Sequence, residues 1–424
     1  MEADRSFDFP LPSAAREVMS RLDAAGYEVF FVGGCVRDLL RGVTPSDYDM
    51  TTSATPEEMH RVFAHYRTID TGIRHGTLTV LAEKSAFEIT TYRVDGTYAD
   101  SRHPDAVRYT ASLKEDAARR DFTVNAIAYH PEKGLYDYFG GCADIEKKIL
   151  RAVGDPDRRF REDALRILRA LRFSATLGFA IEPETAAAAK QNAHLLRNVS
   201  AERVREELTK LLCGDHAAAV LSEFSDILAT LFPRWYEWLS AGDLTAEEAL
   251  SRLGAQLSFA PKDPVSRYTV FLSPFVHAEQ AAAQMDELRF DHRTRDRVAK
   301  LLSHHNDPCR AEIRSARRFL SGLGAADACL LLDLRRAAKL AAGEDGEEEL
   351  LQKAVVRALV EEEGVCSSIA DLAVSGKDLF ALGFSEGREL GLALKSLFAA
   401  VAEGRVKNEK NALLSYAEQQ LKRR

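Results

Sequence analysis

Two aspartates, Asp47 and Asp49, stand two residues apart in the segment PSDYDMTT. If this segment is a β-strand, both side chains leave the same face, with their backbones roughly 6.5 Å apart. Mg²⁺ prefers a few carboxylates together with substrate phosphates, and two such ions about 3.5 to 4 Å apart can activate an attacking hydroxyl and neutralise a departing pyrophosphate. The pair therefore predicts a magnesium site, although DxD pairs are also common on ordinary surfaces.

A glycine turn precedes the aspartates. The segment YEVFFVGGCVRDLL reads as a strand, then Gly33 and Gly34, then a helix. Such a turn exposes backbone N–H groups to a phosphate and leaves no Cβ in the way. Arg37 follows about one helical turn later and could add a forked charged contact. A tight turn with a surface arginine is the alternative, but the position of the turn between a strand and the aspartate pair favours a triphosphate site.

A third acid, Glu88, is embedded in the β-forming stretch FEITTYR. A charge in such a stretch indicates that one face of the strand meets either a cation or solvent. Glu88 is therefore a candidate third carboxylate beside the metal, and an edge-strand glutamate facing water is the equally open alternative.

The segment REDALRILRALRF predicts a helix on which Asp163 and Arg166 share a face. Arg169 is turned farther round, and Arg172 lies nearly opposite Asp163. One carboxylate acceptor beside one guanidinium donor matches the Watson–Crick edges of cytosine and adenine, whereas uracil and guanine reverse that order. On spacing alone, however, an ordinary surface salt bridge is the favoured interpretation.

The segment EDAARRDFTVNAIAY places Arg119 and Arg120 before a predicted helix, with Asp121 and Asn125 four residues apart on one face. We expect Arg120 to bind phosphate, and Asp121 with Asn125 to orient a ribose. The alternative is a plain helix start with a capping aspartate.

The elements that must position these residues change character along the chain. The first third alternates strand and helix patterns, and from about residue 150 apolar residues recur at helical spacing. A chain of 424 residues is also longer than one common domain. Weak boundaries fall near residues 214–215, 304–308 and 343–349.

Composition restricts the class of protein. The net charge of −8 argues against a protein that coats nucleic acid indiscriminately, but residues 151–172 carry seven arginines against four acids. Six cysteines without a CxxC motif indicate neither a disulfide framework nor a structural zinc site. The N-terminal segment lacks a secretory pattern and no stretch is apolar enough to cross a membrane, so the cytoplasm is the expected compartment.

Seven segments in the first 215 residues, taken in order, resemble the bacterial class II tRNA nucleotidyltransferase and poly(A) polymerase family, specifically its CCA-adding enzymes: GGCVRDLL, DYD, FEITTYRVDGTYADSRHPD, RRDFTVNAIAY, DYFGG, REDALRILRALRF and SAERVREELTKLL. The resemblance implies an α+β chain. The domains that the resemblance implies begin with a catalytic nucleotidyltransferase head, which has a small mixed β-sheet, at residues 1–148. A helical neck that reads the base is expected at residues 149–214. A helical body at 215–308 and a helical tail at 309–424 hold the tRNA.

Carried over position by position, the resemblance implies that Asp47 and Asp49 bind Mg²⁺ and that Glu88 assists them. Together with the spacing arguments above, the predicted nucleotide-binding set is Gly33, Gly34, Arg37, Arg119, Arg120, Asp121, Asn125, Asp163, Arg166, Arg169 and Arg172. Among these, helix geometry makes Arg172 the least secure.

The implied reaction adds C, C and A to the 3′ end of tRNA from CTP and ATP without a nucleic-acid template, and no protein partner is implied. Residues 93–104 resemble a loop that CCA-adding and A-adding members possess and CC-adding members lack, and ADLAVSGKDLFALGF resembles the tail of Firmicute-type members. An A-adding enzyme or a poly(A) polymerase remains the enzymatic alternative. A catalytically silent tRNA-binding protein is the alternative from another class, and three acids placed where RNA phosphates must pass speak against it. His304 and His305 are expected to be surface residues.

Overall fold

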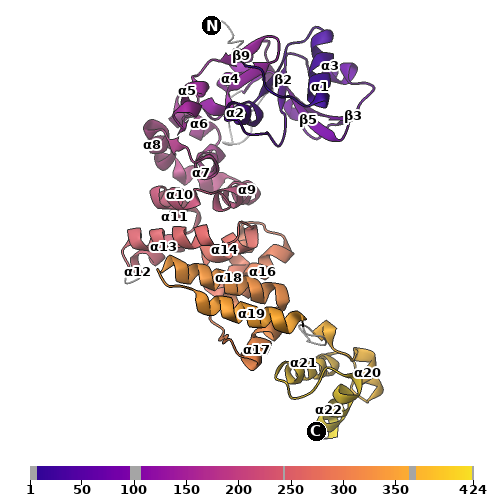
Figure 1. The fold of residues 1–424 in the computed structure, drawn as a ribbon. Coiled ribbons are helices and arrows are strands. Elements are labelled where there is room, and N and C mark those ends of the chain that lie inside the picture. Colours follow the sequence, from indigo (N-terminus) through magenta and orange to yellow (C-terminus); the bar gives the residue numbers. More distant parts are fainter. Residues whose placement is uncertain (1–6, 96–106, 242–243, 362–368, 423–424) are drawn as a thin grey trace. The chain divides into compact units, whose positions relative to one another are not determined.

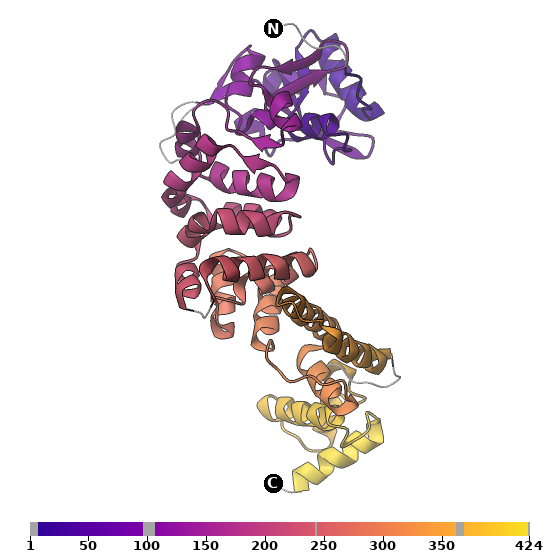
Figure 2. The same ribbon diagram turned by 60° about the vertical axis from the view of Figure 1, so that its left-hand side comes forward.

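The computed structural model describes four stretches of the chain, residues 7–95, 107–241, 244–361 and 369–422. The chain divides into two compact units, one formed by residues 1–211 with 224–232 and the other by residues 212–223 with 233–424. The first unit contains a β-sheet and helices, and the described part of the second is built from helices (Figures 1 and 2). The predicted α+β fold class is confirmed.

The sheet of the first unit has seven strands in the order β3-β4-β5-β2-β1-β8-β9. The pairs are antiparallel except for β2 with β5, which run parallel. The inner strand β1 is buried at every position, which explains its unbroken apolar run VFFV. The seven strands are β1 (Val29–Val32), β2 (Met50–Thr52), β3 (Arg67–Ile69), β4 (Thr77–Ala82), β5 (Ser85–Thr91), β8 (Ile127–His130) and β9 (Gly134–Asp137).

A smaller ribbon pairs β6 (Arg93–Asp95) with β7 (Val107–Tyr109). The loop predicted from residues 93–104 lies, apart from β6, outside the described residues. A further short parallel pair joins β10 (Ile149–Leu150) to β11 (Ala180–Ile181).

Helix α1 (Ser13–Ala24) packs on the sheet through one apolar face that includes Val18, Met19 and Leu22. Helix α3 (Pro56–Val62) begins with a capping box in which Thr55 and Glu58 bond to each other's backbone N–H groups. The other helices among the described residues before 150 are α2 (Gly34–Leu40), α4 (Leu113–Ala118) and α5 (Gly141–Glu146), with 3₁₀ turns η1 (Ile73–His75) and η2 (Thr123–Asn125).

The strand predicted to run through Asp47 and Asp49 is wrong in its extent, because β2 begins at Met50. The Asp49 carbonyl still accepts a hydrogen bond from the Val32 N–H at 3.0 Å, which extends the pairing with β1 by one residue. The sheet therefore fixes the backbone of Asp49, whereas Asp47 lies in the preceding loop.

The single helix predicted over REDALRILRALRF is also wrong. Helix α6 (Pro156–Glu162) ends at Asp163, whose φ of −145° and ψ of 103° are extended, and α7 (Leu165–Leu177) starts two residues later. Helix α7 buries residues on most of its surface, among them Leu168 and Leu171. The same unit contains α8 (Pro183–Gln191), η3 (Ala193–Asn198), most of α9 (Ala201–Leu212) and α11 (Ser225–Leu231).

The second unit has two groups of helices with separate buried residues. Helix α14 is buried from Val265 to Leu272, Arg267 included, and its neighbours include α13, α16 and α18. A C-terminal cluster forms its own core around Leu379, Leu397 and Leu413. The helices are α10 (Ala217–Glu223), α12 (Arg234–Ala241), α13 (Ala246–Phe259), α14 (Pro264–Leu272), α15 (Ala278–Glu287), α16 (His292–Ser303), α17 (Ile313–Leu323), α18 (Ala325–Ala341), α19 (Glu347–Glu361), η4 (Ile369–Asp371), α20 (Gly376–Ala381), α21 (Arg388–Ala402) and α22 (Lys410–Lys422).

Helix length and hydropathy rule out a bilayer-spanning helix anywhere in the described stretches. His304 and His305 are half-buried rather than fully exposed. The His304 ring bonds to Asp307 at 2.6 Å, so a local contact accounts for this histidine.

Candidate functional site

Asp49 and Glu88 lie side by side across two inner strands of the sheet, and Asp47 lies in the loop just before β2; these three acids form the carboxylate edge. Because Met50 of β2 pairs with Ile89 of β5 in parallel register, the residues before them, Asp49 and Glu88, are neighbours across the two strands. Glu88 also faces Thr79 of β4, so β5 is an inner strand and the edge-strand alternative for Glu88 is wrong. The Glu88 side chain is nonetheless exposed, and therefore accessible to a ligand.

The three acids lie close enough for their charges to interact. Burial, then the negative charges of Asp47 and Glu88, raise the pKa of Asp49 to about 6, and the positive charge of Arg120 opposes the shift. The described residues contain no group of three or more His, Cys, Asp or Glu side chains assembled to hold a metal ion. The edge thus gathers negative charge that a cation would relieve, with oxygens left to be supplied by a ligand.

The glycine turn lies beside this edge. Gly33 has a φ of +76°, which favours glycine, and a Cβ placed on it would lie 3.6 Å from Nη1 of Arg120. A Cβ on Gly34 would lie 3.5 Å from Nη2 of Arg37. Two guanidinium groups therefore flank the turn.

The side chain of Arg37 is buried. Its guanidinium is bonded by Asp38 through Nε and Nη2 and by the Asn125 side-chain oxygen at 2.8 Å through Nη1. The remaining contact of this group is the ring of Phe173, 5.3 Å from the guanidinium carbon.

A cavity of about 260 Å³ in the first unit collects six of the predicted residues. It is lined by Arg119, Arg120, Asp121, Asp163, Leu165, Arg166, Arg169 and Arg203. Five guanidinium groups against two carboxylates make its wall suited to an anion. Arg120 belongs both to this wall and to the surroundings of Asp49, and so links the cavity to the carboxylate edge.

Asp121 is buried and accepts several hydrogen bonds. Its Oδ2 accepts two bonds from Arg169, at 2.8 and 2.6 Å, and its Oδ1 accepts from the Asn125 amide at 3.2 Å. Burial would raise the pKa of Asp121, but the charge and hydrogen bonds of Arg169 outweigh burial and lower the pKa to about 2. The predicted contact between Asp121 and Asn125 is present, although the segment forms the 3₁₀ turn η2 and not an α-helix.

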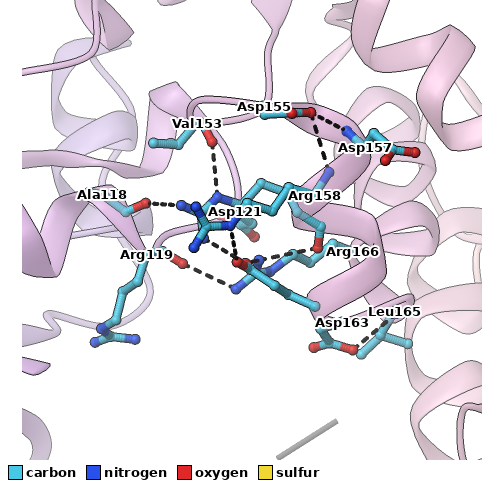
Figure 3. A network of polar contacts seen from close by, with 12 residues as sticks. Ala118, Arg119, Asp121, Val153, Asp155, Asp157, Arg158, Asp163, Leu165 and Arg166 are labelled. Carbon is cyan, nitrogen blue, oxygen red and sulfur yellow. Dashed lines mark hydrogen bonds and ion pairs between the residues drawn. The ribbon is translucent and has the colours of Figure 1, made fainter. Parts of the chain in front are cut away.

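Asp163 and Arg166 line the same cavity but do not form the predicted pair. Both Asp163 oxygens accept from Arg203 of α9, at 3.2 and 2.7 Å. Arg166 donates to Glu162 at 2.9 Å and to the Arg119 carbonyl at 3.1 Å, the second contact being visible in Figure 3. The cause is the break at Asp163, which takes its side chain off the face of α7.

Arg172 does not line the cavity. It donates to Glu207 of α9 at 2.7 Å, and its guanidinium carbon lies 3.5 Å from the centroid of the Phe173 ring. Glu207 is buried and also contacts Arg169 at 3.5 Å. Arg172 therefore supports Glu207 and, through it, Arg169.

Four charged residues of the site were not predicted from the sequence: Asp116, Glu162, Arg203 and Glu207. Arg203 and Glu207 are four residues apart in SAERVREELTKLL, a helical spacing that puts both on one face of α9. Arg203 is opposite in charge to Asp163, and Glu207 is opposite in charge to Arg172. These charges were the signal in the sequence that the residues could form ion pairs. Nothing in the sequence said which arginine or acid each would meet.

Comparisons with known proteins agree with this arrangement. Residues 29–151 match the Poly A polymerase head domain family, residues 178–238 match the RNA and SrmB-binding site of polymerase A, and residues 267–417 match tRNA nucleotidyltransferase domain 2. The CCA-adding enzyme of Limosilactobacillus fermentum is 35% identical to the chain over 416 residues, which cover 96% of the chain and 97% of that enzyme. The chain belongs to the CCA-adding enzyme family.

Two further members are similar over the whole length. The CCA-adding enzyme of Geobacillus kaustophilus is 35% identical over 402 residues, covering 94% of this chain and 95% of that enzyme. The crystal structure of the Bacillus stearothermophilus CCA-adding enzyme in complex with CTP superposes with a TM-score of 0.74 at 30% identity and covers 97% of both chains. As a member of the CCA-adding family, this chain is a nucleotidyltransferase, and the family assigned from the sequence motifs is confirmed.

Proposed function

We propose that this member of the CCA-adding family adds C, C and A to the 3′ end of tRNA, from CTP and ATP and without a nucleic-acid template. The observation that carries the proposal is the cavity in which guanidinium groups and two carboxylates from head and neck face one space, with Arg120 linking it to the carboxylate edge. The relative from Bacillus stearothermophilus, crystallised with CTP, supports the nucleotide assignment.

The phosphates are assigned to the arginine end of this site. Arg119 and Arg120 line the cavity, and Arg120 also flanks the Gly33 turn, where no Cβ obstructs the backbone. Guanidinium groups make charge-assisted bonds to phosphate oxygens, and the glycine backbone adds N–H donors. Arg37, held by Asp38 and Asn125, is assigned to shaping this turn and contributing positive charge from beneath it.

The carboxylates are assigned to a divalent metal, and we propose Mg²⁺. The residues fit this ion, because Asp47 and Asp49 offer hard oxygen donors at a place where burial, and then the charges of Asp47 and Glu88, raise the pKa of Asp49. When bound, Mg²⁺ favours attack by the tRNA 3′-hydroxyl on the α-phosphate and stabilises the leaving pyrophosphate. Glu88 adds a third negative charge on the neighbouring strand and is assigned to support the pair.

The base is assigned to the neck side of the cavity, lined by Asp163, Arg166 and Arg169. An acceptor beside a donor matches the amino group and ring nitrogen that cytosine and adenine share. Asp163 is already held by Arg203 through both oxygens, so its orientation toward a base is fixed by another helix. Asp121 with Asn125 is assigned to the ribose, and Arg172 to support through Glu207.

The helical remainder of the chain is assigned to tRNA, recognised by shape and backbone contacts. The domain limits proposed are a head at 1–148, a neck at 149–214, a body at 215–308 and a tail at 309–424. We propose that the enzyme acts in the cytoplasm, where tRNA, CTP and ATP occur together.

Primer extension tests the proposal. A tRNA transcript ending at the discriminator base, offered CTP and ATP together, should gain two C and one A, and with CTP alone it should gain two C. The variant Asp47→Ala should lose incorporation and keep tRNA binding. Addition of A only to a transcript ending in CC would mean an A-adding enzyme, a long A ladder would mean a poly(A) polymerase, and no incorporation would mean a binding protein.

A further inference from the structure

A buried carboxylate that does not line the cavity makes hydrogen bonds to several parts of the site. Asp116 of α4 has 0% exposure. Its Oδ1 accepts from Nε of Arg119 at 2.9 Å and from the backbone N–H of Arg93 at 3.3 Å. Its Oδ2 accepts from Nη2 of Arg120 at 3.2 Å and from the Thr51 hydroxyl at 3.2 Å. Both oxygens are therefore fully used.

Two of the four partners of Asp116 are the arginines at the phosphate end. Arg119 and Arg120 both line the cavity, whereas Asp116 does not. Nη2 of Arg120 is bonded to Asp116, and its Nη1 lies 3.6 Å from the Cβ position of Gly33. One end of the Arg120 fork is thus anchored and the other is directed at the glycine turn.

Asp116 also connects these arginines to the sheet. Thr51 lies on β2, two residues after Asp49, and Arg93 is the first residue of β6. The Thr51 hydroxyl can alternatively donate to the Thr90 carbonyl of β5, at 3.1 Å. A single carboxylate therefore sets the distance between the arginines and the strand that follows the catalytic aspartates.

The charge state of Asp116 suits an anchor. Burial would raise the pKa of Asp116, but the positive charges of Arg120 and Arg119 outweigh burial and lower it, so the carboxylate is ionised at neutral pH. An arginine side chain without such a partner samples many rotamers, and it must lose that freedom when it binds phosphate. Anchoring before the ligand arrives removes this cost from binding.

We propose that Asp116 is a positioning residue that holds Arg119 and Arg120 in the orientation that binds the triphosphate of either nucleotide. The proposal rests on the proposed function, because it assigns the phosphates to this end of the cavity. Asp116 lines neither the base side of the cavity nor the metal edge. Loss of the Asp116 carboxylate should therefore weaken the binding of CTP, ATP and pyrophosphate by the same factor. The choice of base should remain unchanged.

The test is Asp116→Asn, which keeps the size of the side chain and an oxygen acceptor but removes the charge. We expect the KM for CTP, on a transcript ending at the discriminator base, and the KM for ATP, on a transcript ending in CC, to rise by the same factor of about ten. The inhibition constant of pyrophosphate should rise by that factor too, with a smaller change in kcat. The preference for CTP over UTP should not change.

Asp144→Asn is the matched control. Asp144 is a buried aspartate of the same unit that accepts from the Thr123 hydroxyl at 2.7 Å and from Arg151 at 3.2 Å, and it does not line the cavity. The Asp144→Asn variant should have a lower melting temperature than the wild type, with unchanged KM values and unchanged inhibition by pyrophosphate. If Asp116→Asn does not fold, Thr51→Val is tested in its place, because that change removes one hydrogen bond to Asp116. It should raise the KM values and the inhibition constant of pyrophosphate by a smaller, equal factor.

Several results would overturn the proposal. One is a folded Asp116→Asn enzyme with unchanged pyrophosphate inhibition, and another is a change in KM for one nucleotide only. Equal effects in Asp144→Asn would show general destabilisation instead of positioning. A wild-type enzyme that adds no nucleotide would refute the proposed function, whereas an active wild type with unaltered variants would refute only the role of Asp116.

Discussion

Asp49 should make the metal-free protein less stable at neutral pH than it would be without this charge. Burial and the charges of Asp47 and Glu88 raise its pKa from the ordinary value of 3.8 to about 6 in the folded state. Below about pH 4 the carboxyl is protonated in both the folded and the unfolded chain, so it costs nothing. As the pH rises from about 4 to 6 only the unfolded chain ionises freely, and the stability falls. Above about pH 6 the full penalty remains.

The size of the penalty follows from the shift. About two pKa units at about 1.4 kcal/mol each correspond to about 3 kcal/mol at most, because the half-buried side chain keeps some solvent. For a unit of roughly 200 residues, 1 kcal/mol moves the melting temperature by about 2 to 4 °C. Asp49→Asn should therefore raise the melting temperature of the metal-free first unit by up to about 10 °C at pH 8. The gain should vanish near pH 4.

Calorimetry in EDTA is the suitable assay, because both tryptophans, Trp235 and Trp238, belong to the second unit and do not report on the first. The transition that moves when MgCl₂ and CTP are added identifies the first unit. Asp8→Asn, a change at an exposed acid of the same unit, is the control and should leave the transition in place. A variant Asp49→Asn that is less stable than the wild type at pH 8, or equally altered at all pH values, would refute the reasoning.

Four further substitutions test a buried ion pair, two glycines and the choice of base. Arg169→Met should destabilise the first unit by about 3 to 5 kcal/mol, because Asp121 is left charged and buried, and calorimetry should show it. Gly141→Ala should prevent folding, measured as loss of the calorimetric transition, because its Cβ would overlap a backbone carbonyl oxygen. Gly391→Ala, inside α21 with no atom near its Cβ, should instead stabilise by about 0.5 to 1 kcal/mol. Asp163→Asn should reduce the preference for CTP over UTP at least tenfold in single-turnover extension, and an unchanged preference would remove Asp163 from base reading.

Local signals in the sequence singled out the glycine turn and the acids of the carboxylate edge as candidates. The positive φ of Gly33 favours glycine after the apolar strand, whereas a Cβ at Gly33 or Gly34 would make only ordinary contacts. Asp49 and Glu88 were found as acids beside β-forming residues. Their adjacency came from the parallel pairing of β2 with β5, which depends on residues about 40 positions apart.

The neck shows where local reasoning failed. Helical spacing placed Asp163 and Arg166 on one face because it assumed one continuous helix. The break at Asp163 and the arrival of α9 gave both residues other partners, Arg203 and Glu162. An ion pair is decided by which opposite charge is nearest in space, and α9 lies about 40 residues away along the chain.

The sequence by itself determined the kind of protein: the α+β order of elements, and the acids and arginines available in the first 215 residues. Only the tertiary structure decided which of these charges face a common cavity and which are consumed in supporting it. The physical reason is that residue types and local spacing are written along the chain, whereas burial and charge pairing depend on distances between elements that sequence spacing does not contain. Asp116, a plain helix residue in the sequence, becomes a candidate anchor of the site for that reason alone.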